Sequence, residues 1–164
     1  MHDELTRIDI QKMEAELEEH RREWPDLIAE VQRTRAFGDL SENYEYKAAK
    51  QAQNQCRRRM RYLENMIKTA RVIDDRSAAD EVGLYDKVEI YMPEDDETET
   101  VQIVTTVRCD PNRGLISKES PFGKSILGRK VGDRITVHVN ESYSYEAEIR
   151  SITKGEDDGS AALL

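Results

Sequence analysis

Apolar side chains recur in steps of three and four residues along two long segments, and this repeat constrains the fold more than any other feature. In residues 5–36 the repeat positions are Ile10, Met13, Leu17, His20, Trp24, Leu27 and Val31, and in residues 43–71 they are Ala49, Ala52, Cys56, Met60, Leu63, Ile67 and Ala70. Such stepping is typical of the seam of a coiled coil. Two seams joined by a short connection predict an antiparallel helical hairpin. At about 1.5 Å per residue, helices of roughly thirty residues give a rod about 45 Å long, with "FGDLSE" at its exposed tip.

Two residues depart from the pattern of the first helix. His20 occupies a seam position, where a histidine is ordinarily a packed polar residue or a device that sets the register. Pro25 lacks a backbone donor, so we expect the helix to kink or restart there.

The second half of the chain has a different period. "KVEIYM" and "VQIVTTV" alternate with period two around an acidic turn, "PEDDETET", and "KVGDRITVHV" and "YSYEAEIRSI" supply further strands. "DPNRG" is a strong turn signal, and "SPFGKSILG" predicts a short helix with Ser120 as N-cap, Pro121 at the first position and Gly128 past the end. The expected fold class is α+β. The expected order is the hairpin at 1–75, a linker at 76–82, a mainly antiparallel sheet domain at 83–154 and a flexible tail at 155–164.

Composition and charge restrict the classes of function. The chain has 164 residues and a net charge of −9, which argues against bulk attraction to nucleic acid phosphates. Cys56 and Cys109 lie in dissimilar contexts and are expected to be reduced thiols. The three histidines show no zinc-ligand spacing, which argues against a zinc site of the chain's own. Without a signal peptide or a membrane-length apolar run, we expect a cytoplasmic protein with no membrane partner.

The tip contains carboxylates that admit two interpretations. Asp39 and Glu42 have nearly the spacing of a capping box, so Asp39 could cap the second helix while Gly38 ends the first. Alternatively, both acids project outward as ligands of a hard cation. Mg²⁺ takes six oxygens and sheds water reluctantly, so two carboxylates bind it poorly unless a partner supplies the remaining ligands. A two-metal phosphoryl-transfer site on a partner would meet that need.

The two helices also differ in charge. Acids dominate the first and bases the second, where the basic side chains are Lys47, Lys50, Arg57, Arg58, Arg59, Arg61, Lys68 and Arg71. One interpretation is ion pairing across the hairpin with solvated outer faces. The other is a basic stripe that meets phosphates or an acidic protein surface.

The stretch "RTRAFGDLSENYEYKAAKQAQ" closely resembles the tip motif of the Gre factors, the bacterial transcript cleavage factors of RNA polymerase. The resemblance continues through "RYLENMIKTARVID" and "LISKESPFGKSILGRKVGDRITV", and covers nearly the whole chain. It implies a coiled-coil hairpin followed by a domain of FKBP-like fold. It also implies that the second domain docks at the secondary channel of bacterial RNA polymerase while the hairpin enters the channel. The protein would not be an enzyme itself but would stimulate the polymerase to cleave backtracked RNA. We expect a monomer.

The same resemblance implies roles for individual residues. Asp39 and Glu42 would help to hold a Mg²⁺ ion shared with the polymerase and not bound stably by this chain alone. The residues that would support the tip are Gly38, Leu40, Ser41, Asn43, Glu45 and Tyr46. The residues that would contact the region near the RNA 3′ end form a basic set made of Arg35, Lys47, Lys50, Arg57, Arg58 and Arg59.

Two other functions stay open at the level of sequence. A related protein could occupy the same channel and inhibit or modulate the polymerase without stimulating cleavage. The C-terminal domain could instead act alone as a prolyl isomerase or a chaperone. The fold does not bring isomerase activity with it, because no aromatic proline pocket is evident and Phe122 is one of only two phenylalanines.

Overall fold

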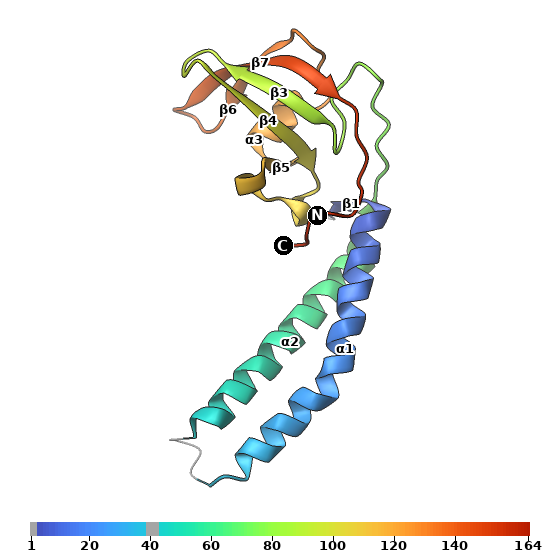
Figure 1. Ribbon diagram of the computed structural model, residues 1–164, viewed down its shortest axis with the longest axis vertical. Helices are drawn as coiled ribbons and strands as arrows, with labels where there is room; N and C mark the ends of the chain where they lie inside the picture. Colours follow the sequence, from blue (N-terminus) through green and yellow to red (C-terminus); the bar gives the residue numbers. More distant parts are fainter. Residues whose placement is uncertain (1–2, 39–42) are drawn as a thin grey trace. The chain divides into compact units, whose positions relative to one another are not determined.

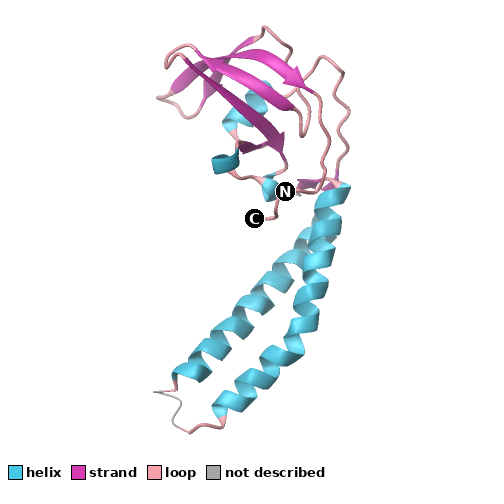
Figure 2. Cartoon of the chain, viewed as in Figure 1, coloured by secondary structure: helices cyan, strands magenta, loops and turns pink. Residues whose placement is uncertain are grey.

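The computed structural model describes residues 3–38 and 43–164, and the chain divides into two compact units (Figure 1). The first unit contains residues 10–71 apart from the gap, together with Asp3. The second contains residues 4–9 and 72–164. Helices dominate the first unit and strands the second (Figure 2).

The helical hairpin is formed by α1 (Arg7–Arg35) and α2 (Tyr44–Thr69), which confirms the two predicted helices. The seam is buried where the repeat predicted: Met13, Leu17, Ala49, Cys56 and Leu63 are almost inaccessible to solvent. Other seam positions are half-buried, as expected for two helices without a third layer to cover them. α1 continues through Pro25, so the predicted restart does not occur.

The start of α1 is stabilised by a capping box. The Thr6 hydroxyl accepts a hydrogen bond from the Asp9 backbone N–H at 3.2 Å, and the Asp9 carboxylate accepts one from the Thr6 N–H at 2.8 Å. Just before it, β1 (Glu4–Leu5) pairs with β2 (Arg71–Val72), and the Ile73 N–H donates to the Leu5 carbonyl.

A five-stranded sheet forms the centre of the second unit, in the order β5-β4-β3-β7-β6. Its strands are β3 (Lys87–Met92), β4 (Glu97–Val104), β5 (Leu115–Ser117), β6 (Arg134–His138) and β7 (Ser144–Thr153). The pairs β3–β4, β3–β7 and β6–β7 are antiparallel, whereas β4 and β5 are parallel. The sheet is therefore mixed, with the predicted antiparallel character in most of its pairs.

Two strand boundaries differ from the sequence prediction. The acidic turn occupies only residues 93–96, and Glu97 already faces Met92 in the ladder. Asp96 adopts a positive φ of 53° and accepts a hydrogen bond from the Tyr91 hydroxyl, which closes the turn early. At the other end β4 stops at Val104, because residues 106–108 form a 3-10 turn in place of the predicted strand.

The short helix α3 (Pro121–Ile126) begins and ends as predicted. Ser120 is its N-cap and accepts from the Gly123 N–H at 3.0 Å, and Gly128 has a φ of 76°. Ile126 is buried in the core with apolar side chains of the sheet, including Ile90 and Ile149.

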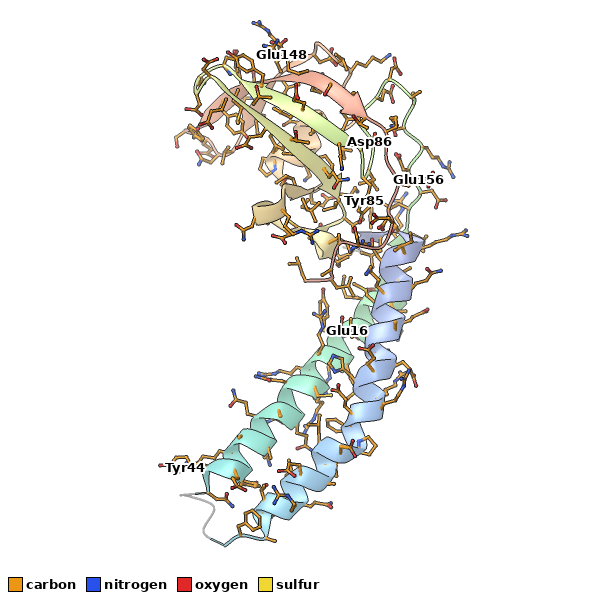
Figure 3. All side chains as sticks on the ribbon, in the orientation of Figure 1. Glu16, Tyr44, Tyr85, Asp86, Glu148 and Glu156 are labelled. Carbon is orange, nitrogen blue, oxygen red and sulfur yellow. The ribbon has the colours of Figure 1, made fainter. Side chains whose placement is uncertain are left out.

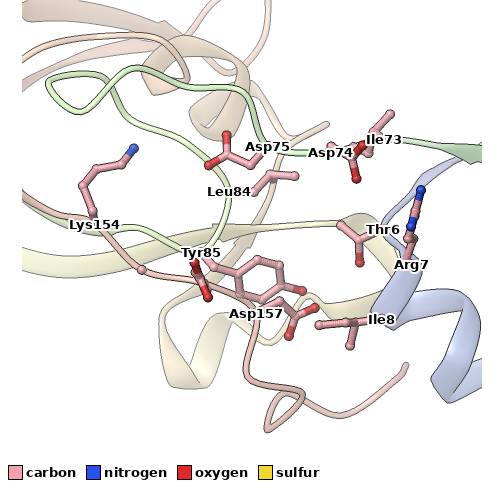
Figure 4. Close-up of a pocket in the computed structure, with 12 residues that line it drawn as sticks. Thr6, Arg7, Ile8, Ile73, Asp74, Asp75, Leu84, Tyr85, Lys154 and Asp157 are labelled. Atoms are coloured by element: carbon pink, nitrogen blue, oxygen red, sulfur yellow. The ribbon is translucent and has the colours of Figure 1, made fainter.

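The C-terminal segment, predicted to be a flexible tail, instead makes specific contacts within the second unit. Arg108 is completely buried; its guanidinium donates to the Asp9 and Asp157 carboxylates and to the Ala161 carbonyl. The Leu164 N–H also donates to Val107. A pocket of about 800 Å³ opens beside this cluster, with Tyr85 and Asp157 in its wall (Figure 4). The sequence pattern missed these contacts because the partners are far apart along the chain.

Candidate functional site

The described ends of the tip are held together by Asn43. Its side-chain amide donates to the Thr34 carbonyl at 2.7 Å, and its side-chain oxygen accepts from the Tyr46 N–H at 3.0 Å. One side chain therefore binds the last turn of α1 to the first turn of α2. Gly38, with a φ of 104°, lies in the left-handed region that favours glycine, and it follows the end of α1 as predicted.

Asn43 is the N-cap of α2, so the interpretation of Asp39 as that cap is wrong. A capping box for α2 would need its partner acid at the third helical position, which Tyr46 occupies. Asp39, Leu40, Ser41 and Glu42 lie outside the described residues. The predicted Mg²⁺ ligands are thus confined to the connection between Gly38 and Asn43.

The residues next to this connection combine aromatic rings with charged groups. Phe37 is exposed and lies under the Arg33 guanidinium, 5.2 Å from its ring centre. Tyr44 is 79% exposed, and the Lys47 ammonium lies 5.5 Å from its ring (Figure 3). Glu45 lies in the first turn of α2, where a carboxylate interacts favourably with the helix dipole.

A basic groove runs along α2 from Tyr46 to Arg61. It encloses about 530 Å³ and is lined by Tyr46, Lys47, Lys50, Gln51, Asn54, Arg57, Arg58 and Arg61. The spacing of three and four residues places these side chains on one face of the helix. Lys50 lies 5.9 Å from the Tyr46 ring, and Arg57 lies 5.8 Å from the Trp24 ring. The groove is open, positively charged and rich in hydrogen-bond donors, which suits a phosphate-bearing or acidic ligand.

The structure brings together most but not all of the predicted basic set. Lys47, Lys50, Arg57 and Arg58 line the basic groove. Arg61 also lines it; it was one of the basic side chains of the second helix but not a member of the set that the resemblance implied. Arg35, the last residue of α1, is exposed and not part of the groove lining.

Arg59 is also not part of this lining and binds across the hairpin. Its Nε and Nη2 donate to the two oxygens of Glu16 at 2.6 and 3.1 Å. The hydrogen bond from Arg59 is the largest effect that holds the pKa of Glu16 below its usual range. Arg21 and Glu64 make a second, exposed pair between the helices at 3.2 Å. Ion pairing and a basic stripe therefore both occur, on different faces of α2.

A small apolar pocket lies on the sheet of the second unit. It has a volume of about 180 Å³ and is lined by Ile90, Met92, Glu99, Val101, Ile116, Phe122 and Tyr145. Phe122 and Tyr145 are its two aromatic residues, and its volume is below the usual range for small-molecule sites. No helix in the described ranges 3–38 and 43–164 has the length and apolar character of a membrane span.

Family models match both units. A model described as the N-terminal domain of transcription elongation factor, GreA_GreB_N, matches residues 4–72. A second, described as the C-terminal domain of transcription elongation factor GreA/GreB, matches residues 77–154.

Curated relatives match most of the chain. Transcription elongation factor GreA of Oenococcus oeni is 37% identical over 154 residues, which is 92% of this chain and 94% of that protein. GreA of Bacillus velezensis is 41% identical over 134 residues, 81% of this chain and 85% of that protein. Among solved structures, the transcription factor Gfh1 is 24% identical with a TM-score of 0.46, covering 93% of this chain and 97% of that chain.

Proposed function

Because the chain belongs to the GreA/GreB family of transcription elongation factors, we propose that it binds bacterial RNA polymerase and stimulates the polymerase's own cleavage of backtracked RNA. The helical hairpin enters the secondary channel and carries the tip toward the polymerase active site. The chain is not the enzyme in this reaction. It supplies groups to a catalytic centre on its partner.

Asp39 and Glu42 are the groups that act at that centre. Their carboxylate oxygens would complete the coordination of a Mg²⁺ ion that the polymerase also holds, because hard oxygen ligands are those that Mg²⁺ prefers. Such an ion positions a water molecule and offsets charge that develops on the scissile phosphate. The chain's own part is to bring the two acids to the ion and to hold them there.

The observation that carries this proposal is the position of the helix cap. Asn43 fills the N-cap of α2 and binds α1 to α2, so the hairpin is closed by a neutral side chain next to the acids. Capping therefore does not account for the presence of Asp39. A role toward a partner accounts for both acids in the sequence between Gly38 and Asn43.

The basic groove supports a contact with the RNA. Its charge is concentrated on one face of α2 in a protein whose net charge is −9, so the attraction to phosphate is local. In the proposed complex this face receives the 3′ segment of the backtracked transcript.

The experiment is a cleavage assay on stalled, backtracked elongation complexes with Mg²⁺. The chain should speed the release of short 3′ RNA fragments. Asp39→Asn and Glu42→Gln should abolish this stimulation while both variants still compete with the parent chain for polymerase. Glu19→Gln, at an exposed acid of α1 away from the tip, is the matched control and should keep most of the stimulation.

Two outcomes would contradict the proposal. If both tip variants stimulate cleavage as well as the parent, the carboxylates do not act on the ion. If the parent chain binds and slows the polymerase without cleavage, the protein is instead an inhibitor that occupies the same channel.

A further inference from the structure

Three potential metal ligands meet at the seam of the hairpin, far along the helices from the tip. They are His20 and Glu23 on α1 and Cys56 on α2, and their ligand atoms all lie within 4.8 Å of one another. The Cys56 Sγ lies 3.8 Å from the His20 Nδ1, and a Glu23 carboxylate oxygen lies 3.7 Å from the same nitrogen. One nitrogen, one sulfur and one oxygen thus surround a single point between the helices.

These separations are close to those around a tetrahedral ion. With bonds of roughly 2.0–2.1 Å to nitrogen and oxygen and 2.3 Å to sulfur, tetrahedral zinc places nitrogen and oxygen about 3.3 Å apart, and sulfur about 3.6 Å from either of them. The nitrogen–sulfur distance of 3.8 Å and the nitrogen–oxygen distance of 3.7 Å are longer than these values by about 0.2 and 0.4 Å, and all three ligand atoms lie within 4.8 Å of one another. Coordination would therefore require side-chain rotations that bring the three ligand atoms closer together.

The second nitrogen of His20 is oriented as metal-bound histidines usually are. Its Nε2 lies 3.4 Å from a carboxylate oxygen of Glu16, and Glu16 is itself held by two hydrogen bonds from Arg59. A carboxylate at Nε2 favours the tautomer with the proton on that nitrogen, which leaves the lone pair of Nδ1 directed at Cys56 and Glu23. This supporting contact is independent of the three ligands.

The surroundings decide which ion would bind and how open the site would be. Cys56 is buried in the seam, whereas the side chain of Glu23 is 64% exposed, so a fourth position is available to water. The Cys56 thiol must lose its proton to bind an ion, and a ligand set of sulfur and nitrogen favours thiophilic ions over Mg²⁺.

We propose that His20, Glu23 and Cys56 form a binding site for a zinc-like divalent transition-metal ion that joins α1 to α2. This proposal differs from the sequence analysis, in which the spacing of the histidines argued against a zinc site of the chain's own. The ion would act as a cross-link between the helices, and its fourth ligand would be water.

The test uses untagged full-length protein freed of metal with a chelator. Co²⁺, which mimics Zn²⁺ and is coloured, should bind at one ion per chain and give a thiolate-to-metal charge-transfer band together with the visible bands of tetrahedral coordination. Zn²⁺ should displace it. At 100 times its dissociation constant, Zn²⁺ should raise the melting temperature by roughly 5 °C or more, whereas Mg²⁺ should not.

Variants separate this site from adventitious binding. Cys56→Ser should remove the charge-transfer band and weaken Zn²⁺ binding by more than about 100-fold, and Glu16→Gln should weaken it roughly tenfold through His20. Cys109→Ser and His138→Gln are the matched controls and should bind as the parent does. Because Cys56→Ser could loosen the seam, its fold is checked by circular dichroism, and the parent protein's spectrum is read independently of any variant.

Three results would overturn the proposal. The first is a parent protein that shows no charge-transfer band with excess Co²⁺. The second is a band that Cys109→Ser removes and Cys56→Ser keeps. The third is equal Zn²⁺ affinity in the parent and in Cys56→Ser.

Discussion

Replacing Asn43 tests whether one side chain closes the hairpin at the tip. Asn43→Ala removes the N-cap of α2, which costs about 1 kcal/mol. It also removes the hydrogen bond to the Thr34 carbonyl, worth about 1 kcal/mol more. Asn43→Ser keeps a side-chain acceptor for the Tyr46 N–H but cannot donate as the amide does, so only the second part is lost. We expect the free energy of unfolding to fall by about 2 kcal/mol for alanine and about 1 kcal/mol for serine.

The measurement is urea unfolding of the hairpin followed by the helical signal in circular dichroism, with amide exchange at Tyr46 and Lys47 as a local probe. For a unit of this size, 2 kcal/mol corresponds to a melting temperature lower by roughly 8–16 °C. Gln51→Ala, elsewhere on α2, is the control and should change stability by less than about 0.5 kcal/mol.

The relative stabilities of the alanine and serine variants test this account of Asn43. If serine is as destabilising as alanine, the bond to Thr34 carries the effect and the cap does not. If both variants are within about 0.5 kcal/mol of the parent, Asn43 does not close the hairpin and the argument about the tip loses its structural basis. At temperatures where the variants are folded, we also expect lower stimulation of cleavage from Asn43→Ala.

Three further predictions follow from contacts away from the tip. Neutralising Arg58 and Arg61 in the basic groove should change the preferred length of the cleaved RNA fragments, as measured on gels. Arg59→Gln should leave that length unchanged and lower the stability of the hairpin, because Arg59 pairs with Glu16. Arg108→Met should destabilise the second unit by about 3–5 kcal/mol in calorimetry, because Asp9 and Asp157 would stay buried without their partner; a loss below about 1 kcal/mol would contradict the account. The folded pKa of Glu16 is lowered below 4.5, chiefly by its hydrogen bond to Arg59, so the pair stabilises the fold fully above that pH and less as the pH falls through the lowered pKa. The difference in the free energy of unfolding between the parent and Glu16→Gln, measured by urea titration, should therefore shrink as the pH falls below 4.5. A difference that stays constant with pH would contradict the stabilising role of the Glu16–Arg59 pair.

The sequence predicted the hairpin well because a seam repeat is a local signal that persists over many turns. The signals of α3, which are the Ser120 cap, Pro121 and Gly128, were equally predictable, since each acts within a few residues. The residue that caps α2 was not predicted correctly. Asp39, Ser41 and Asn43 all have capping side chains, and only the end of α1, where Thr34 offers its carbonyl, selects Asn43. The Arg108 cluster was beyond sequence reasoning, because a buried arginine depends on two carboxylates from opposite ends of the chain.

The ligand cluster at the seam shows what the register of a hairpin adds to such reasoning. His20 and Cys56 are equally distant in sequence from Gly38, where the chain reverses direction, so an antiparallel hairpin places them opposite one another. Spacing along one helix cannot reveal such a pair, whereas pairing positions across the turn does.

The two proposed metal functions of the hairpin are kept apart by ligand chemistry and by distance. From His20 to Gly38 the helical rise of about 1.5 Å per residue gives roughly 27 Å, so an ion at the seam cannot reach the tip. Asp39 and Glu42 offer only hard oxygen atoms, which suit Mg²⁺, while Cys56 and His20 offer sulfur and nitrogen, which suit Zn²⁺. An ion at the seam would therefore strengthen the hairpin that carries the tip without competing for the ion at which the tip acts.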